Sequence, residues 1–354
     1  MKVVITCAGS AGHINPAIAI ANIFKENFNS EILFICSKTG IENDLVKNAG
    51  YDILNISTGK LIRRVTIDNI KNIFNMLKGI KESKKILKEF IPDIVVGTGG
   101  YICMSVLTAS KQLKIPYIIH ESNVVPGLST KLLAKGASKI LTGYDIEINN
   151  SVCVGNPVIF NIDEYDKLDK YILKKKYNIP DKDIVLVYGG SQGAQIINDI
   201  LINLIRVKKD KTLFFILITG KTNFIPNFNK AKGLEEYIKV IDYAYDIFEL
   251  YKISDMCVTR AGALTINELK ILNKPAVLIP LKTSAENHQL YNATLFEKNK
   301  YGALIQEEDL NFDRLYNKVK NILFNKEIYI KKMEKENKID VKANILNEIL
   351  KVVK

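Results

Sequence analysis

The sequence lacks the features that mark secreted, membrane-spanning and metal-binding proteins. Its five cysteines are widely spread without a Cys-x-x-Cys pair, so neither a disulfide framework nor a zinc site is expected. The three histidines lie far apart, and we expect no metal and no cofactor. No apolar run approaches the ~18–20 residues that cross a bilayer, and the first run is too short for a secretion signal. These absences predict a chain that stays in the cytoplasm.

Two common nucleotide-binding signatures are missing as well. The turn at Gly9–Gly12 does not have the GxGxxG spacing, and Cys36-Ser37-Lys38 offers no acid for a ribose. No Gly-Lys-Ser/Thr follows the turn, which excludes a Walker P-loop. A hydride-transfer enzyme is therefore the weakest alternative, and tight binding of a nicotinamide cofactor would be needed to revive it.

Length and charge set broad limits on the fold and its partners. The chain of 354 residues suits two domains of ~150–180 residues each, and its 47% hydrophobic and 25% charged residues are those of an ordinary soluble protein. The net charge of +12 indicates either a solvated basic surface or anionic partners such as lipid headgroups and phosphorylated substrates. No compact segment interleaves its lysines with aromatic residues, so no nucleic-acid partner is expected.

Short strand-like runs alternate with helical patterns along the chain, which predicts an α/β protein with two doubly wound, Rossmann-like domains. In the first half, strands are expected at 2–7, 31–36, 51–56, 93–97, 116–119 and 138–142. In the second half, they are expected at 183–188, 213–218, 238–241, 255–259, 275–279 and 301–305. Helical patterns fill the gaps, for example 16–28 and 286–299. We place the domains at 1–156 and 164–335, and a terminal helix at about 340–354 can return to the first domain.

The same kind of turn occurs in both halves of the chain. Val3–Cys7 leads into Ala8-Gly9-Ser10-Ala11-Gly12-His13, and Ile184–Tyr188 leads into Gly189-Gly190-Ser191-Gln192-Gly193-Ala194. A second glycine turn follows a later strand in each half, at Gly97–Tyr101 and at Arg260–Thr265. A strand, a glycine turn and a helix in succession leave backbone N–H groups and a positive dipole end facing open space, which suits phosphate. The four turns predict two anion-binding domains that face one interdomain cleft.

Two side chains near these turns have chemistry of their own. His13 lies at the mouth of a helix, where an imidazole can act as a base, bind an anion or merely cap the helix. Thr265 and Glu268 fall about one helical turn apart. A carboxylate at that place can accept a pair of sugar hydroxyls, or it can simply balance the positive end of the helix.

Residues 60–90 form a basic amphipathic segment. Nine lysines and arginines stand against three acids, a net +6, and apolar residues recur at helical spacing: Ile70, Ile73, Phe74, Leu77 and Ile80. Such a helix can lie on an anionic membrane surface. Alternatively, the apolar stripe packs on the sheet and the lysines form a solvated face.

The sequence contains three further motifs besides the four glycine turns. They are His120-Glu121-Ser122-Asn123, Gly155-Asn156-Pro157-Val158, and Asn287-His288-Gln289 with Asn292-Ala293. In these motifs, in the turns and in Glu268 the whole chain resembles the MurG family, peripheral membrane glycosyltransferases with a two-domain GT-B fold. Ile159 is one departure, because many members of that family carry an arginine after Asn-Pro-Val.

The resemblance implies a reaction and its partners. The chain is expected to transfer N-acetylglucosamine, with inversion, from UDP-N-acetylglucosamine to the muramic acid 4-hydroxyl of a polyprenyl-diphosphate-linked muramyl peptide, lipid I, in peptidoglycan synthesis. It is expected as a peripheral protein on the cytoplasmic face of the cell membrane. A UDP-sugar epimerase of the same two-domain fold is the alternative. A non-catalytic docking subunit fits less well, because such subunits carry one half and this chain carries both.

The resemblance also implies site residues. His13 is the candidate base, and acceptor contacts are expected from Gly99, Gly100, Tyr101 and Glu121. Donor contacts are expected from both halves: Ser10, Ala11, Gly12, Asn123, Gly190, Ser191, Gln192, Gly193, Ala244, Arg260, Ala263, Leu264, Thr265, Glu268, His288 and Gln289. The turn Gly190–Ala194 is expected on the diphosphate, Glu268 on the ribose, and His288 and Gln289 on the sugar. The acceptor diphosphate is expected near Ser10–His13.

Overall fold

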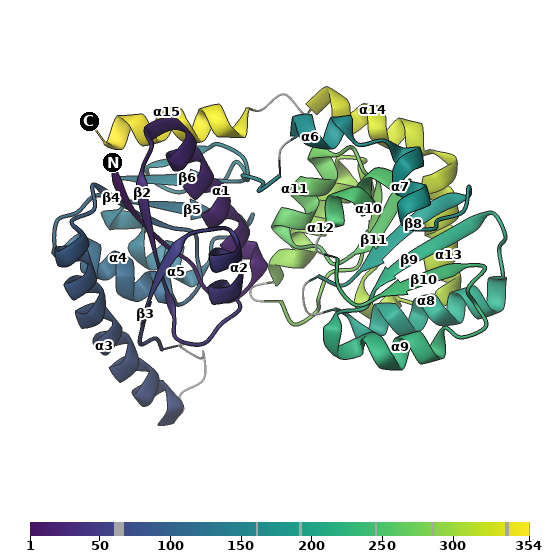
Figure 1. Ribbon diagram of the computed structural model, residues 1–354, viewed down its shortest axis with the longest axis horizontal. Helices are drawn as coiled ribbons and strands as arrows, with labels where there is room; N and C mark the ends of the chain where they lie inside the picture. Colours follow the sequence, from purple (N-terminus) through teal and green to yellow (C-terminus); the bar gives the residue numbers. More distant parts are fainter. Residues whose placement is uncertain are drawn as a thin grey trace. The chain divides into compact units, whose positions relative to one another are not determined.

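The structure is a computed structural model of the whole chain. It describes residues 1–59, 67–160, 162–190, 193–244, 246–284, 287–336 and 340–353. The chain folds into two compact units: an N-terminal unit made of Met1–Ile159 and Ile339–Lys354, and a C-terminal unit made of Phe160–Lys338. Figure 1 shows each unit as a sheet with helices on both of its faces.

The N-terminal unit is built on a parallel sheet. Among its described residues, seven strands pair in the order β3-β2-β1-β4-β5-β6-β7. They are Lys2–Thr6 (β1), Glu31–Ser37 (β2), Asp52–Ile56 (β3), Ile94–Gly97 (β4), Tyr117–Glu121 (β5), Lys139–Thr142 (β6) and Ser151–Cys153 (β7). The strand order reverses between β1 and β4. In sheets of this kind ligands bind at the carboxyl ends of the strands beside the reversal.

Helices cover both faces of this sheet, because strand runs such as Val3–Ile5 send apolar side chains alternately into two cores. One face carries α1 (Ala11–Phe28), α2 (Glu42–Asn48) and α15 (Val341–Val352). The other carries α3 (Ile67–Phe90), α4 (Ile102–Gln112), α5 (Leu128–Leu133) and the 3-10 helix η1 (Ala134–Gly136). Among the residues that the structure describes, no helix is both long and apolar enough to cross a bilayer.

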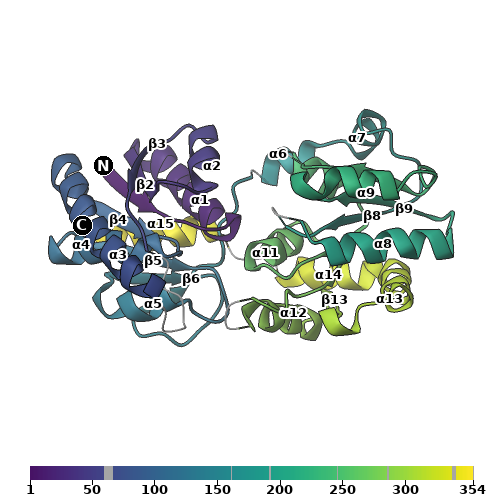
Figure 2. The ribbon, with the colours of Figure 1, turned by 90° about the horizontal axis from the view of Figure 1, so that it is seen from below.

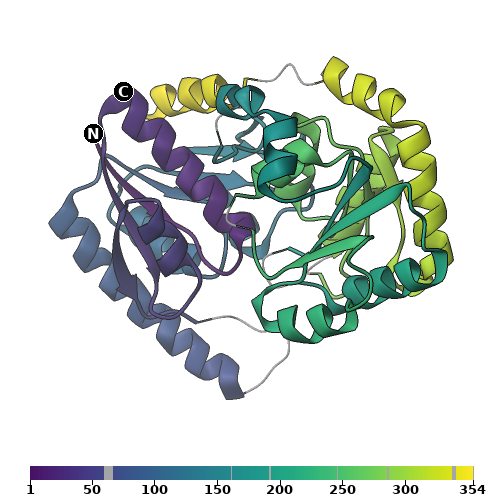
Figure 3. The same ribbon diagram turned by 45° about the vertical axis from the view of Figure 1, so that its right-hand side comes forward.

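The last helix of the chain, α15, belongs to the N-terminal unit. Its Ile345 and Ile349 are buried in the core beneath α1 and β6, and Lys342 lies 2.6 Å from the carboxylate of Glu26 on α1. α15, yellow in Figures 1 and 3, lies beside the purple α1. The chain therefore leaves the N-terminal unit after Ile159 and returns to it at its end.

The C-terminal unit repeats the plan. Its described residues form six parallel strands in the order β10-β9-β8-β11-β12-β13. They are Asp183–Tyr188 (β8), Leu213–Ile218 (β9), Ile238–Ile241 (β10), Met256–Thr259 (β11), Ala276–Leu278 (β12) and Gly302–Leu304 (β13). The order reverses between β8 and β11, which makes the carboxyl ends of these two strands the expected ligand edge.

Two groups of helices enclose the C-terminal sheet. One face carries α8 (Gln195–Lys208), α9 (Phe224–Lys230) and α13 (Phe312–Phe324), and α8 and α13 lie next to each other in Figure 2. The other carries α6 (Ile162–Lys167), α7 (Lys170–Lys176), α10 (Ile247–Ile253), α11 (Ala263–Ile271), α12 (His288–Lys298) and α14 (Lys326–Glu336). The 3-10 helices η2 (Lys221–Asn223) and η4 (Glu307–Asp309) lie in connecting loops.

The expected alternation of strands and helices is confirmed, with two corrections. All the expected strands are present with ends within two residues of prediction, but β7 was not expected. The first helix was expected at 16–28 and in fact begins at Ala11. The Ser10 carbonyl already accepts hydrogen bonds from the N–H groups of His13 and Ile14, so the first turn forms ahead of Pro16. His13 therefore lies inside the helix and not in the loop before it.

Candidate functional site

The two glycine turns of the N-terminal unit pack against each other. They follow β1 and β4, which are neighbours with Thr6 opposite Gly97. A Cβ on Gly100 would lie 2.2 Å from the carbonyl oxygen of Ala8, and one on Gly99 would lie 2.5 Å from Nδ1 of His13. Both glycines also have a positive φ, +110° at Gly99 and +88° at Gly100. The close approach of the two turns therefore depends on glycine.

His13 is held in one orientation by the turn that follows β4. Its Nδ1 lies 3.1 Å from the carbonyl oxygen of Thr98, and the Thr98 hydroxyl donates to the carbonyl of His13 at 2.7 Å. Because a carbonyl can only accept, Nδ1 carries the proton of the neutral ring, and Nε2 carries the lone pair. This is the tautomer in which Nε2 can take a proton from a substrate.

The start of α1 is suited to an anion. Ser10, at its N-cap, makes no side-chain capping bond, and the first turn contains no acid. The expected donor residues Ser10, Ala11 and Gly12 thus contribute backbone N–H groups that are not capped by a side chain. α4 likewise begins after Tyr101 with no side-chain cap and no acid in its first turn.

Glu121 organises the loop that follows β5. Its Oε1 accepts from the backbone N–H and the side-chain amide of Asn123, both at 3.0 Å. Its Oε2 accepts from the N–H of Gly127 at 2.9 Å and from the hydroxyl of Thr130 at 2.7 Å. With both carboxylate oxygens engaged inside the protein, Glu121 shapes the loop, and its contact with an acceptor stays a prediction. The same holds for Asn123 and the donor.

His120 serves the structure. It is 1% exposed, and burial lowers its pKa to about 4 in spite of a hydrogen bond to the carbonyl of Gly155. The ring is therefore neutral, and its Nε2–H fastens the end of β5 to the segment that leaves the N-terminal unit. Asn156 reinforces this attachment by donating to the carbonyl of Ser122 at 3.0 Å.

In the C-terminal unit the turn after β8 is closely packed at Gly193 and open at Gly190. Gly190 and Gly193 have φ of +87° and +76°. A Cβ on Gly193 would lie 2.1 Å from the carbonyl oxygen of Thr219, whereas one on Gly190 would meet nothing within 4 Å. α8 follows with no side-chain cap at Ala194 and no acid in its first turn, which suits an anion. The expected contacts Ser191 and Gln192 lie outside the described residues.

The turn after β11 brings most of the other expected donor residues to the same edge of the sheet. β8 and β11 are neighbours, with Thr259 opposite Tyr188. α11 then presents buried Ala263 and Leu264 and half-buried Thr265 and Glu268. Ala244, half-buried, follows β10 and so belongs to the same carboxyl edge.

Glu268 is a half-buried carboxyl group to which the described residues offer one hydrogen bond, from the Tyr251 hydroxyl to Oε2 at 3.1 Å. None of the ion pairs among the described residues includes Glu268. Burial raises its pKa to about 7, and the hydrogen bond from Tyr251 opposes that rise. Tyr251 was not anticipated from the sequence.

Arg260 is engaged inside the protein. Its guanidinium donates to the carbonyls of Ile279 and Pro280 at 3.2 and 3.3 Å and to Oε1 of Glu307 at 2.9 Å. The Lys282 N–H donates to the other oxygen of Glu307. Arg260 and Glu307 therefore hold the loop that leads from β12 to α12, and the contact of Arg260 with a donor stays a prediction.

His288 and Gln289 lie at the start of α12, and both are half-buried. Oε1 of Gln289 accepts from the N–H of Leu281 at 2.9 Å. That bond closes the loop and leaves the amide nitrogen, Nε2, as the group that can donate to a sugar hydroxyl.

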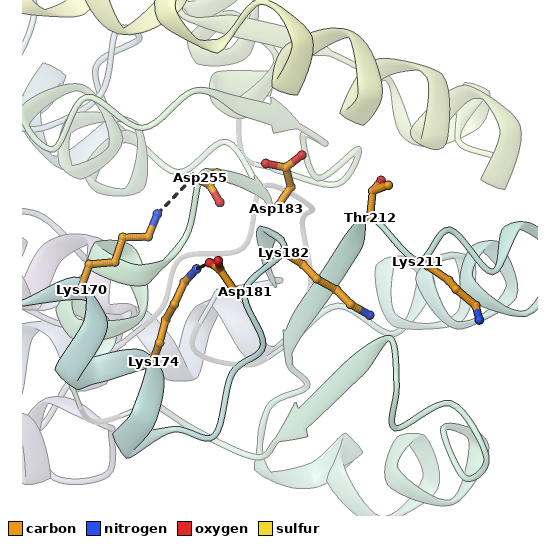
Figure 4. A pocket seen from close by; sticks show the side chains of 8 residues that line it. All are labelled: Lys170, Lys174, Asp181, Lys182, Asp183, Lys211, Thr212 and Asp255. Carbon is orange, nitrogen blue, oxygen red and sulfur yellow. Dashed lines mark hydrogen bonds and ion pairs between the residues drawn. The ribbon is translucent and has the colours of Figure 1, made fainter.

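A separate cavity of about 500 Å³ lies at the opposite, amino edge of the C-terminal sheet (Figure 4). Its lining includes Asp183 at the start of β8 and Asp255 just before β11. Lys170 pairs with Asp255 at 3.1 Å and Lys174 with Asp181 at 2.9 Å. These pairs fasten α7 to the ends of the strands, and the glycine turns lie at the other edge.

Comparison with known proteins agrees with this geometry. Residues 3–142 match the glycosyltransferase family 28 N-terminal domain, and residues 184–349 match the glycosyltransferase family 28 C-terminal domain. The crystal structure of MurG from Acinetobacter baumannii is similar over 99% of both chains, with a TM-score of 0.77 and 22% identity. Two Rossmann-like units in this order define a glycosyltransferase of the GT-B fold.

Sequence relatives narrow the class. A protein of Thermoanaerobacter sp. (strain X514) is 34% identical over 365 residues, which cover 100% of this chain and 99% of the relative. One of Clostridioides difficile (strain 630) is 36% identical over 370 residues, which cover 99% and 89%. Both are named UDP-N-acetylglucosamine–N-acetylmuramyl-(pentapeptide) pyrophosphoryl-undecaprenol N-acetylglucosamine transferase. The chain belongs to this family, the MurG family, and is a hexosyltransferase, which favours transfer over epimerisation.

Proposed function

We propose that this chain moves N-acetylglucosamine from UDP-N-acetylglucosamine to the muramic acid 4-hydroxyl of lipid I, with inversion, and so makes lipid II. The observation that carries the proposal is the full-length match to transferases of that name, together with uncapped helix starts after the glycine turns of both units. In that role the chain serves peptidoglycan synthesis and, through it, cell shape and division.

The donor belongs to the C-terminal unit in this proposal. The Gly190–Ala194 turn and the start of α8 hold the diphosphate, since N–H groups and the helix dipole favour negative charge there. Glu268 accepts the ribose hydroxyls, and Ala244, Ala263, Leu264 and Thr265 line the nucleoside. Nε2 of Gln289 and the His288 ring bind the sugar, while Arg260 keeps their loop in place.

The acceptor belongs to the N-terminal unit. Its diphosphate meets the turns at Ser10–His13 and Gly99–Tyr101. His13 removes the proton of the attacking 4-hydroxyl through Nε2 as the new C1–O4 bond forms. The bond between C1 and the UDP oxygen breaks on the opposite face of the sugar, and UDP leaves with the electron pair. Its growing charge is met by the N–H groups that hold the diphosphate.

The proposal is tested by incubating the purified chain with UDP-N-acetylglucosamine and a short-chain lipid I analogue. We expect release of UDP and formation of the disaccharide product, both dependent on the acceptor. An incubation with donor alone is the control, and an epimerised donor in that control would establish the alternative activity. If neither UDP release nor sugar transfer is observed, the proposed activity is wrong.

We also propose that α3 docks the protein on the cytoplasmic face of the cell membrane. Ile73, Phe74 and Leu77 are 44%, 68% and 49% exposed, so this part of the apolar stripe does not pack on the sheet. Further along the helix Leu87 is buried in the core, and Figure 1 shows the amino-terminal part of α3 extending beyond the sheet. Exposed lysines flank the apolar residues, which suits an anionic lipid surface.

Replacing Lys78, Lys81, Lys84 and Lys85 by glutamine is expected to weaken binding to anionic vesicles at low salt by tenfold or more. Each lysine near such a surface contributes ~1 kcal/mol, and salt screens that attraction. The measurement is vesicle co-sedimentation across a salt series. Four exposed lysines of the C-terminal unit, Lys232, Lys298, Lys331 and Lys335, form the matched control. Equal loss in both variants, or none in the α3 variant, would rule out α3 as the docking element.

A further inference from the structure

Two tyrosines and Glu268 form a line of hydrogen bonds, and the proposed reaction gives no role to the tyrosines. Tyr188 is the last residue of β8, Tyr251 lies on α10 and Glu268 on α11. The two phenol oxygens are 2.7 Å apart, and the Tyr251 oxygen is 3.1 Å from Oε2 of Glu268. The rings meet edge to face at 76°, with centroids 6.1 Å apart. The line thus joins three different elements and ends on one carboxylate oxygen.

The direction of these bonds follows from their chemistry. An ionised carboxylate can only accept, so the hydrogen of Tyr251 points to Glu268. Tyr251 then has only lone pairs left for Tyr188, which must donate to it. Each bond polarises the next, and both phenol groups are buried, Tyr251 at 0% exposure and Tyr188 at 4%. The line therefore ends with a fixed donor on Oε2.

The carboxyl group of Glu268, at the end of this line, has fewer partners than expected for a carboxylate with a purely structural role. Burial disfavours its charge, and the described residues give Glu268 neither a cation nor a second hydrogen-bond donor. Two other buried or half-buried carboxyl groups among the described residues are better compensated: Glu121 accepts four hydrogen bonds, and Asp255 has two lysines. Tyr251 holds Oε2 of Glu268 in place, whereas no described residue donates a hydrogen bond to Oε1. Oε1 can therefore accept a hydrogen bond from a ligand.

We infer that Tyr251, supported by Tyr188, is a positioning residue that fixes the Glu268 carboxylate so that Oε1 and the second lone pair of Oε2 receive the two ribose hydroxyls of the donor. The inference rests on the proposed ribose contact of Glu268. Tyr251 does not touch the donor; it selects the rotamer of the group that does. Pre-orientation of this kind lowers the entropy cost of binding.

The variant Tyr251→Phe tests the inference, because it removes the hydroxyl and keeps the ring that packs in the core. We expect UDP to bind about tenfold more weakly and the KM for UDP-N-acetylglucosamine to rise by a similar factor, with kcat nearly unchanged. Tyr188→Phe is expected to act in the same direction and about threefold, because it weakens the line one step further from the carboxylate.

A nucleotide without ribose hydroxyls separates positioning from general damage. Calorimetry with UDP and with 2′,3′-dideoxy-UDP gives the affinity ratio of the two ligands for each variant. In the unchanged protein UDP is expected to bind more tightly, and Tyr251→Phe should lower the affinity for UDP alone, so that the ratio falls about tenfold. A merely structural role would weaken both ligands equally and leave the ratio as it was.

Tyr301→Phe is the matched control. Tyr301 is buried in the same core cluster and its hydroxyl also bonds a carboxylate, that of Glu336 on α14. This variant should leave both affinities unchanged. An unchanged ratio in Tyr251→Phe, with UDP still preferred by the unmodified protein, would overturn this inference alone. Equal binding of the two nucleotides by the unmodified protein would overturn the ribose contact of Glu268 and this inference with it.

Discussion

Replacing His13 by alanine is expected to lower kcat by roughly 10²-fold or more, because the attacking hydroxyl then has no base within reach. The effect should fall on kcat and leave the affinity for UDP unchanged, since the proposed nucleotide site is formed by the C-terminal unit. Steady-state kinetics with the lipid I analogue and calorimetry with UDP measure the two effects separately.

The variant His13→Asn separates proton removal by Nε2 from the structural hydrogen bond that Nδ1–H donates to Thr98. An asparagine amide can occupy the place of Nδ1–H and donate to the Thr98 carbonyl, so the local contact between α1 and the turn after β4 survives. It has no group in the place of Nε2 that could take a proton. We therefore expect the asparagine variant to be as slow as the alanine variant. Near-normal turnover of either one would remove His13 from the role of base.

Replacing Glu268 by glutamine is expected to raise the donor KM by about 10²-fold with a much smaller change in kcat. Hydrogen bonds to a charged group contribute about 1.5–3 kcal/mol each. In the glutamine variant the two ribose hydroxyls would no longer have a charged acceptor. The alanine variant, which removes the group altogether, should be at least as weak. An unchanged donor KM in both variants would exclude the ribose contact.

The same residue gives donor binding a pH dependence. Burial raises the pKa of Glu268 to about 7, with Tyr188, Tyr251 and the thiol of Cys257 as the titratable groups that face it. The ionised form accepts the ribose hydroxyls, so the donor KM of the unchanged protein should rise as the pH falls below about 7. The glutamine variant cannot titrate at this position, and its donor KM should lack that dependence.

The free energy of unfolding should depend on pH in the opposite sense to the affinity for the donor. The folded pKa of Glu268 lies above its unfolded value of 4.5, so the protonated carboxyl favours the fold, and this contribution is lost as the pH rises towards 7. At pH 8 the glutamine variant is expected to be more stable than the unchanged chain by roughly 1–3 kcal/mol. The difference should shrink towards pH 5, as measured by urea unfolding. The proposed ribose contact therefore costs the fold some of its stability.

The strands and the glycine turns could be predicted from the sequence because their signals are local. Ile184–Tyr188 is a continuous apolar run, as expected for a strand buried on both faces, and glycines end it at once. Each turn then contains a conformation that favours glycine, such as the positive φ of Gly190. Short segments with weaker patterns were missed, and β7 has only three residues, none of them fully buried.

What the sequence did not reveal are the partners of the polar side chains. Arg260 is an expected donor contact, but its guanidinium is bound by Glu307, which is 47 residues away and has no motif of its own. Glu121 satisfies both of its oxygens within the following loop. Tyr251 reaches Glu268 from a different helix. Such pairings depend on how elements distant in sequence meet, and composition or periodicity carries no trace of them.

The return of α15 to the N-terminal unit has a consequence for how the protein is made. The C-terminal unit is one continuous stretch, so a ribosome synthesises all of it before α15. The N-terminal unit is delivered first except for α15, whose Ile345 and Ile349 complete the core beneath α1 and β6. During synthesis this apolar surface stays uncovered until α15 emerges, although the other helices and strands of the unit are already present. The unit that is translated first is thus the one that finishes folding last.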